Sequence, residues 1–193
     1  MGSTNGSWGY GIEGVVTGLA DSDEALTRAV RGGDMEAFDA LYARYEVRLF
    51  AYVRRFVDDR GRAEDVFQDV LLTVLRDRSF DPRRGRFAPW LFTVARNRCR
   101  MEQRKGSRES RALDAMPRPA EATEPAYARA DQVRRAMDAL PEPQRQLLLL
   151  KQVAELTYRE IAAVLGVAEG TIKSRLHAAT AAFRAQLAKG ETP

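Results

Sequence analysis

The sequence predicts an all-α protein made of two small helical domains that a flexible linker joins. Apolar residues recur at helical spacing through residues 21–105 and again through residues 127–189, and this is the period of an amphipathic helix. Between these stretches, residues 106–126 are polar, rich in alanine, proline and glutamate, and show no apolar periodicity. No segment of useful length alternates apolar and polar residues in the way a half-buried strand does.

The first domain, over residues 21–105, is predicted to contain four helices, after a flexible, glycine-rich tail over residues 1–20. A short helix over Asp23–Arg31 ends at a glycine pair, and Asp34 is placed to cap the next helix. Helical spacing in that second helix predicts an inward stripe of Phe38, Leu41, Tyr42, Tyr45, Leu49, Tyr52, Val53 and Phe56. The remaining elements are a helix from Arg62 to about Arg76, a loop over Phe80–Arg86, and a helix from about Phe87 to Lys105.

The same spacing predicts which residues of the last two helices face the core. In the third helix these are Ala63, Val66, Phe67, Val70, Leu71 and Val74. In the fourth helix they are Phe87, Trp90, Leu91 and Val94.

The second domain, over residues 127–189, is predicted to end in a helix-turn-helix. Two helices precede it, one over residues 127–140 and one over residues 144–153, after prolines that suit a first helical turn. Thr157 and Glu160 fit a capping box, and Gly166 stands where the chain must turn. The last helix starts near Ala168, and its buried stripe is predicted to be Ile172, Leu176, Ala179, Phe183 and Leu187.

The front of this last helix carries cationic and small polar residues outside the buried stripe: Thr171, Lys173, Ser174, Arg175 and His177. A helix-turn-helix presents the early residues of its second helix to the major groove of DNA. An αα-hairpin inside a helical bundle has the same periodicity and an ordinary solvated face. The helical pattern alone therefore leaves both alternatives open.

Composition excludes several classes of protein. The chain has 193 residues and a net charge of +4, which is mildly basic, so the local distribution of charge matters more than its total. One cysteine permits no disulfide within the chain, and neither it nor the one histidine belongs to a cluster with metal-ligand spacing. No apolar run is long enough to cross a bilayer. These features predict a soluble cytoplasmic protein with no metal, no cofactor and no membrane insertion.

Charge is sorted between the third and fourth helices. The third carries an outer face of Glu64, Asp65, Gln68 and Asp69. From Arg83 to Lys105 there are eight basic residues and one acid, Glu102, and Arg96, Arg100 and Arg104 repeat at i+4 along one face. Opposite signs on neighbouring helices indicate two different partners. The alternative is that the two faces simply pair with each other.

Three blocks of sequence together resemble the extracytoplasmic-function (ECF) sigma factors. The run RAEDVFQDV over residues 62–70 is similar to their region 2.2, and FDP at residues 80–82 with WLFTVARN at residues 90–97 is similar to region 2.3 and the segment after it. LPEPQR over residues 140–145, LTYREIA over 156–162, LGV over 165–167 and GTIKSRLH over 170–177 are similar to region 4. The likeness covers roughly residues 23–105 and 127–187, in the family's order with a linker between.

The resemblance implies a promoter-specificity subunit of bacterial RNA polymerase, which is not itself an enzyme. In the family, the region 2.2 helix docks on the clamp helices of the largest core subunit, so Glu64, Asp65, Gln68 and Asp69 would form that surface. The loop and the helix after it would face the non-template strand of the minus-ten element, with Arg83, Arg84, Arg86, Arg96, Asn97 and Arg100 as the predicted contacts. Trp90 shares a stripe with Phe87 and Leu91, so we interpret it as a core residue rather than as a strand-separating wedge.

The resemblance places the last helix in the major groove of the minus-thirty-five element. Lys173 and Arg175 would reach guanine or phosphate, with Thr171, Ser174 and His177 as shorter contacts, and Arg159 would meet phosphate. Many family members continue with basic residues after the histidine, whereas this chain has alanine, alanine, threonine and alanine at residues 178–181. Fewer phosphate contacts should weaken nonspecific binding and flatten its salt dependence.

Other classes remain as alternatives to the sigma factor. A stand-alone helix-turn-helix regulator would bind palindromic sites as a dimer, although its DNA-reading role gives no reason for the acidic face at residues 64–69. A helical enzyme lacks support, because no phosphate loop, paired catalytic carboxylates or nucleophile–histidine pair is recognisable. The predicted partners are core polymerase subunits, promoter DNA and an anti-sigma factor, since family members are commonly held by one.

Overall fold

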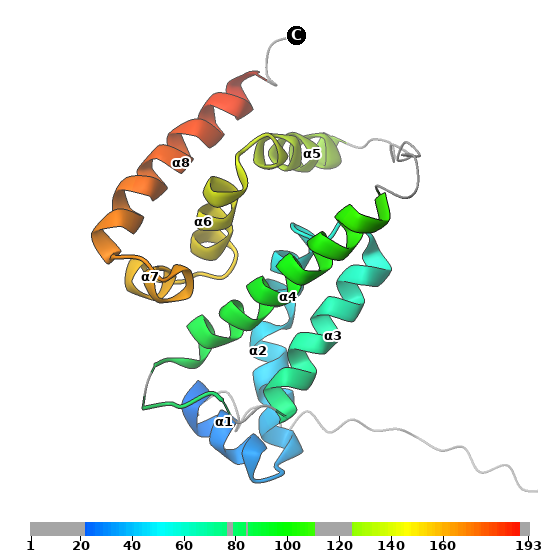
Figure 1. Cartoon of the computed structure of the whole chain (residues 1–193), viewed down its shortest axis with the longest axis vertical. Coiled ribbons are helices and arrows are strands. Elements are labelled where there is room, and N and C mark those ends of the chain that lie inside the picture. The colour runs from blue at the N-terminus through cyan, green and yellow to red at the C-terminus, as the bar shows by residue number, and fades with distance from the viewer. Residues whose placement is uncertain (1–21, 77–78, 84, 111–124, 190–193) are drawn as a thin grey trace, which may run out of the picture.

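The computed structural model describes residues 22–76, 79–83, 85–110 and 125–189, and within them the regular elements are α-helices. In chain order they are α1 (Asp23–Arg31), α2 (Met35–Arg54), α3 (Arg60–Arg76), α4 (Phe87–Ser110), α5 (Pro125–Asp138), α6 (Glu142–Gln152), α7 (Tyr158–Leu165) and α8 (Glu169–Lys189). Figure 1 shows α1–α4 gathered in one bundle and α5–α8 in a second group. The all-α prediction is confirmed. The predicted tail and most of the predicted linker lie outside the described residues.

Several helix boundaries differ from the prediction. Helix α5 begins and ends two residues earlier than predicted, and α6 begins two residues earlier. The differences in α4 and α3 add residues that were expected to lie outside a helix. Helix α4 ends at Ser110 rather than near Lys105, so it continues into the segment expected to be linker. Helix α3 begins at Arg60 and includes Gly61, which the sequence pattern places in the break before it. Both differences have one physical reason. Adding a residue to an existing helix gains a hydrogen bond without a new nucleation step, so polar residues and single glycines often continue a helix.

The first domain is organised around α2, which packs against α1, α3 and α4. Its N-terminus is capped as predicted, because the Asp34 carboxylate accepts a hydrogen bond from the Ala37 N–H at 3.1 Å. The Ser22 hydroxyl caps α1 in the same way. A side chain at the N-cap satisfies a backbone N–H that the first helical turn would otherwise leave unpaired.

The inward faces predicted for the first domain are only partly correct. Six of the predicted residues are half-buried at the flanks of their helices: Phe38 and Tyr42 in α2, Phe67 and Leu71 in α3, and Trp90 and Val94 in α4. In α4, the core also takes three residues that the sequence pattern did not single out, and these are Phe92, Ala95 and Cys99. Phe92 meets the Tyr52 ring edge-on at 5.4 Å between centroids, so α4 buries a wider face than one stripe because both α2 and α3 cover it.

The second domain contains the predicted helix-turn-helix in α7 and α8. The capping box is present: the Thr157 hydroxyl accepts from the Glu160 N–H at 3.3 Å, and the Glu160 carboxylate accepts from the Thr157 N–H at 2.8 Å. Gly166 has φ 68° and ψ 37°, the left-handed conformation that glycine adopts without steric cost. In α8, Ile172, Leu176 and Ala179 are buried as predicted, whereas Phe183 and Leu187 of the predicted stripe are only half-buried. Helix α8 packs against α5, α6 and α7.

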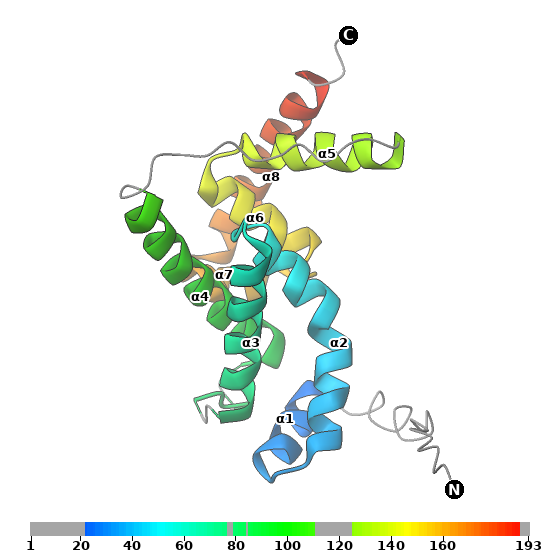
Figure 2. The same cartoon turned by 90° about the vertical axis from the view of Figure 1, so that its right-hand side faces the viewer.

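The two domains touch along one seam, which we define as the contact of α6, α7 and the α6–α7 turn with α2, α4 and the loop before α4. Helix α7 lies against α4, and both views place it beside the first half of that helix (Figure 1 and Figure 2). Two ion pairs cross the seam, Arg48–Glu155 at 2.9 Å and Arg86–Glu160 at 3.0 Å. No helix of the described segments is long and apolar enough to span a bilayer.

Candidate functional site

The loop before α4 is held by an aromatic cluster. The rings of Phe80, Phe87 and Trp90 lie 5.4–5.6 Å apart between centroids, and Phe80 and Phe87 are buried. Trp90 packs in this cluster but is only half-buried. The Arg31 guanidinium of α1 donates to the Phe80 carbonyl and stacks over the Phe80 ring. Contacts from another helix therefore fix the path of the loop.

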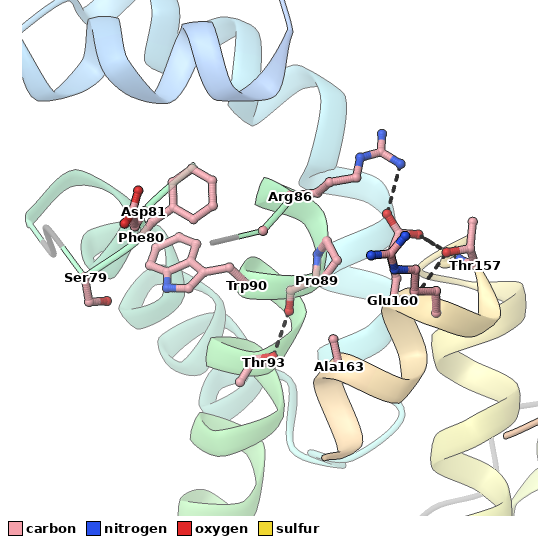
Figure 3. A pocket seen from close by; sticks show the side chains of 12 residues that line it. Ser79, Phe80, Asp81, Arg86, Pro89, Trp90, Thr93, Thr157, Glu160 and Ala163 are labelled. Carbon is pink, nitrogen blue, oxygen red and sulfur yellow. Dashed lines mark hydrogen bonds and ion pairs between the residues drawn. The ribbon is translucent and has the colours of Figure 1, made fainter. Parts of the chain in front are cut away.

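A cavity of about 780 Å³ lies between this loop and the start of α7. The first domain contributes the loop and the first turns of α4, including Arg86, Pro89 and Trp90, and α7 contributes Arg159 and Ala163. Figure 3 shows Trp90 on one side of this space and Ala163 of α7 facing it from the other. Arg86, one of the residues predicted to read the minus-ten element, thus shares a cavity with Arg159, which is predicted to meet the other element.

Glu160 connects the two walls of the cavity. Its Oε1 accepts from the Arg86 guanidinium at 3.0 Å, and its Oε2 accepts from the Thr157 N–H and hydroxyl at 2.8 Å each (Figure 3). The Glu160 side chain is 12% exposed, whereas the Arg86 side chain is 72% exposed. The carboxylate is therefore largely withdrawn from water, while its cationic partner remains open to other anions.

The other residues predicted to meet the minus-ten element lie along the loop and α4. Arg83, Asn97 and Arg100 are exposed, and the Arg83 N–H donates to the Asp81 carboxylate at 2.9 Å, which shapes the loop. Arg96 is half-buried, with its Nε buried and without a hydrogen-bond partner among the described residues. Arg84 lies outside the described residues. This part of the set is therefore an exposed cationic surface, apart from Arg96.

The residues predicted to read the minus-thirty-five element, apart from Arg159, lie on one helix, α8. Lys173, Ser174, Arg175 and His177 are exposed, and Thr171 is half-buried. The Ser174 hydroxyl donates back to the Thr171 carbonyl at 3.1 Å, so it is engaged with its own helix. Lys173, Arg175 and His177 are thus exposed polar side chains in the first half of α8, the part of a recognition helix that lies nearest to base edges in a helix-turn-helix.

The four residues of α3 predicted to bind core polymerase divide between two sides of the helix. Glu64 and Gln68 line a groove of about 680 Å³ between α2 and α3, whereas Asp65 and Asp69 are exposed outside it. The rest of that groove is formed by α2 and by the flank of α3, with Tyr42, Glu46, Val47, Phe50, Ala51, Phe67 and Leu71 as its lining. Val47 is 76% exposed. The surface is an apolar groove with a carboxylate rim.

The sequence did not single out this groove. Phe50 meets the Phe67 ring edge-on at 5.5 Å between centroids, and its position off the inward stripe of α2 was the available signal. The Glu46 side chain raises the pKa of the neighbouring Tyr42 by accepting its hydrogen bond, with burial as a second cause. Tyr42 is therefore a neutral hydrogen-bonding group at the groove at physiological pH.

The α3 and α4 faces of opposite sign are partly paired with each other. Asp69 lies 3.5 Å from Arg98, and Arg62 lies 3.5 Å from Glu102. These pairs have side chains 18–56% exposed, so solvent weakens them, and exposed pairs of this kind contribute about 0–1 kcal/mol. Mutual pairing therefore accounts for part of the charge pattern and leaves Asp65, Arg100 and the groove unexplained.

The described residues hold no group of histidine, cysteine and carboxylate side chains that could bind a metal ion. Cys99 is buried, and burial raises the pKa of its thiol to about 12. A neutral, enclosed thiol is neither a good nucleophile nor a good metal ligand. The surfaces that the described residues do offer are suited to binding nucleic acid and protein.

Known proteins match the chain over both domains. Residues 41–109 match the family model described as Sigma-70 region 2, and residues 130–182 match Sigma-70, region 4. The chain is 34% identical over 171 residues to the ECF RNA polymerase sigma factor SigK of Mycolicibacterium vanbaalenii, covering 83% of this chain and 87% of that protein. It is 35% identical over 163 residues to the ECF RNA polymerase sigma factor RpoE of Cereibacter sphaeroides, covering 80% of this chain and 89% of that protein.

A solved structure agrees with these relatives. The sigma factor RpoE of Bartonella quintana, in complex with the anti-sigma factor NepR, superposes with a TM-score of 0.65 at 28% identity, over 80% of this chain and 98% of that one. These matches favour a sigma factor over the stand-alone regulator. With its two sigma-70 regions in this order and relatives that align along most of its length, the chain belongs to the ECF sigma factors of RNA polymerase.

Proposed function

We propose that this chain binds core RNA polymerase in the cytoplasm through the α2–α3 groove and directs it to promoters that it reads with α4 and α8. It has no catalytic step of its own, because nucleotide addition belongs to the core enzyme. The observation that carries the proposal is the separation of chemistries on one domain. The groove is apolar with carboxylates at its rim, whereas the loop and α4 present Arg83, Arg86 and Arg100.

The groove suits a protein helix better than it suits DNA. Its exposed valine and half-buried aromatic rings give a partner apolar area to cover, and central apolar contacts usually supply most of the binding energy of an interface. Glu46 and Glu64 line the same groove and would repel phosphate but attract a basic helix. We therefore extend the predicted polymerase surface from Glu64 and Gln68 to Val47 and Phe50.

The cationic residues of the first domain suit a single strand of the minus-ten element. Unstacking each DNA step costs about 1.4 kcal/mol, and a good contact to a base returns about 1–3 kcal/mol. Two small modules cannot open several steps by themselves. We propose that core polymerase supplies the remainder, and that Arg83, Arg84, Arg86, Arg96, Asn97 and Arg100 hold the strand once it is open.

The second domain would anchor the complex upstream. Lys173 and Arg175 project from the front of α8 where a recognition helix meets base edges, with Thr171, Ser174 and His177 beside them and Arg159 for phosphate. Ala178 and Ala181 follow as exposed residues without charge. We propose that weak upstream binding is compensated by the tether to a polymerase-bound first domain, which raises the effective concentration of α8 at its element.

An anti-sigma factor is the third proposed partner. The RpoE structure with which this chain superposes was solved with the anti-sigma factor NepR. A protein that covers the α2–α3 groove would block the binding of polymerase, and one that covers the seam between the domains would block the binding of DNA.

Transcription of genomic DNA by core polymerase, with and without this chain, tests the proposed function. The chain should produce new RNA 5′ ends that share two upstream elements, and the core alone should not produce them. The variant Val47→Asp should lose binding to core polymerase at least tenfold, because it places a carboxylate inside the apolar groove. The control Val167→Asp makes the same change at a half-buried residue of the second domain. Identical 5′ ends with and without the chain would reject the proposal.

A further inference from the structure

We propose that the free protein holds itself closed, and that Glu160 acts as an internal substitute for a DNA phosphate that occupies Arg86 until promoter DNA replaces it. The inference rests on the proposed function, since it concerns when the DNA-reading residues become available. Three observations carry it: the position of the Glu160 carboxylate, the shared cavity and the composition of the seam.

Glu160 presents to Arg86 the same kind of group that DNA would present. Its Oε1 accepts from the guanidinium at 3.0 Å, while its Oε2 is held by Thr157. Thr157 thereby orients the free oxygen toward the loop, as Figure 3 shows. A guanidinium binds carboxylate and phosphate through the same donors, so occupation by Glu160 and occupation by a phosphate are mutually exclusive at that position.

The closed arrangement cannot bind a whole promoter. The minus-ten and minus-thirty-five elements are about 25 base pairs apart, which is about 85 Å of duplex, whereas a compact chain of this length is about 40 Å across. Arg86 and Arg159, one for each element, line one cavity. The domains must therefore separate before both can bind DNA, and separation breaks the Arg86–Glu160 and Arg48–Glu155 pairs.

The seam combines apolar burial with charged pairs at its edge. The buried residues of the two domains form one hydrophobic cluster, and the Arg86–Glu160 and Arg48–Glu155 pairs lie at its exposed side. Exposed pairs of this kind contribute about 0–1 kcal/mol each. The two crossing ion pairs therefore add to a closure that apolar contact also supports, and removing them shifts the balance toward the open form.

Removing those two pairs should raise the open population without unfolding either domain. The double variant Glu155→Gln with Glu160→Gln cancels both carboxylates, and glutamine at residue 160 still completes a capping box. The matched control is Glu36→Gln with Glu169→Gln, which makes the same change of charge at exposed residues away from the two pairs. Circular dichroism should give the same helix content for all three proteins.

Small-angle scattering of the full chain in low salt measures closure. Wild type and the control should have a radius of gyration of about 16 Å plus a small contribution from the terminal residues. The double variant should have a larger radius of gyration than both, because more of its population is open. If circular dichroism shows that α7 has lost its helix, Arg48→Gln with Arg86→Gln breaks the same pairs from the first domain and gives the same scattering test.

The affinity of the protein for a short single-stranded oligonucleotide measures whether closure weakens DNA binding. The double variant should bind about threefold to tenfold more tightly than the control, because a population held closed no longer lowers its apparent affinity. A wild type already as extended as the double variant would overturn the proposal, and so would a double variant that binds DNA no better than the control. Neither readout uses polymerase or a promoter, so failure of the transcription experiment would reject the proposed function and leave this result standing.

Discussion

The two regions proposed to read DNA are built in different ways. The proposed recognition surface of α8 belongs to a single helix, and its exposed residues follow from the helical period alone. The loop before α4 depends on other elements, because α1 contributes Arg31 to the Phe80 carbonyl and Glu24 to the Phe87 N–H, the latter at 3.2 Å. A surface on one helix tolerates change in its surroundings, whereas a surface made by a loop fails when any supporting contact is lost.

The largest expected effect is therefore at the support of the loop. Phe87 is buried and contacts Phe80, Trp90 and Tyr45, so Phe87→Ala should cost about 3–5 kcal/mol of stability. Phe183 of α8 is only half-buried, and Phe183→Ala should cost less. Urea unfolding followed by circular dichroism measures both, and equal losses would contradict the contrast between the two regions.

A smaller effect is expected for the base contacts of α8. Arg175→Ala should cost about 1–3 kcal/mol of binding to the upstream element if it meets a base, with less effect on unrelated DNA. The control Arg184→Ala removes the same charge from an exposed position further along α8. Fluorescence anisotropy with holoenzyme and labelled duplex measures the change. A loss equal on all sequences would assign Arg175 to phosphate instead of to a base.

Adding a single methyl group at the turn of the helix-turn-helix should lower the stability of the second domain. Gly166 has positive φ, so Gly166→Ala should destabilise the second domain by about 1–2 kcal/mol. Asparagine tolerates this conformation better than alanine, so Gly166→Asn should cost less. Thermal unfolding of both variants provides the measurement, and identical midpoints for wild type and alanine would show that the turn is not strained.

The smallest effect concerns Cys99, in the core of the first domain. Burial raises the pKa of its thiol to about 12, so the reactive thiolate is scarce at pH 8. Because the folded pKa lies above the unfolded one, this group contributes stability at neutral pH that is lost as the pH rises past about 8.5. Alkylation of the native protein should be slow, whereas the urea-unfolded chain should react at once. Fast native alkylation would mean that the core of the first domain opens readily.

Most of the second domain could be predicted from the sequence, because its determinants are local. The Thr157–Glu160 capping box, the left-handed Gly166 and the Ile172–Leu176–Ala179 stripe depend only on neighbours within a few residues. The α2–α3 groove was not predictable in this way. Phe67 and Leu71 fit the inward period of α3, but α2 covers only part of that face, and which flank remains open depends on where the neighbouring helix lies.

The sequence by itself determined that the chain is helical, where most helices begin and end, and which family it belongs to, because helical period, caps and motif order are properties of short segments. Only the tertiary structure decided that Glu160 of α7 meets Arg86 of the distant loop and that α2 and α3 leave an apolar groove between them. The physical reason is that a side chain's partner across a seam depends on how whole helices pack, and no local pattern records that packing.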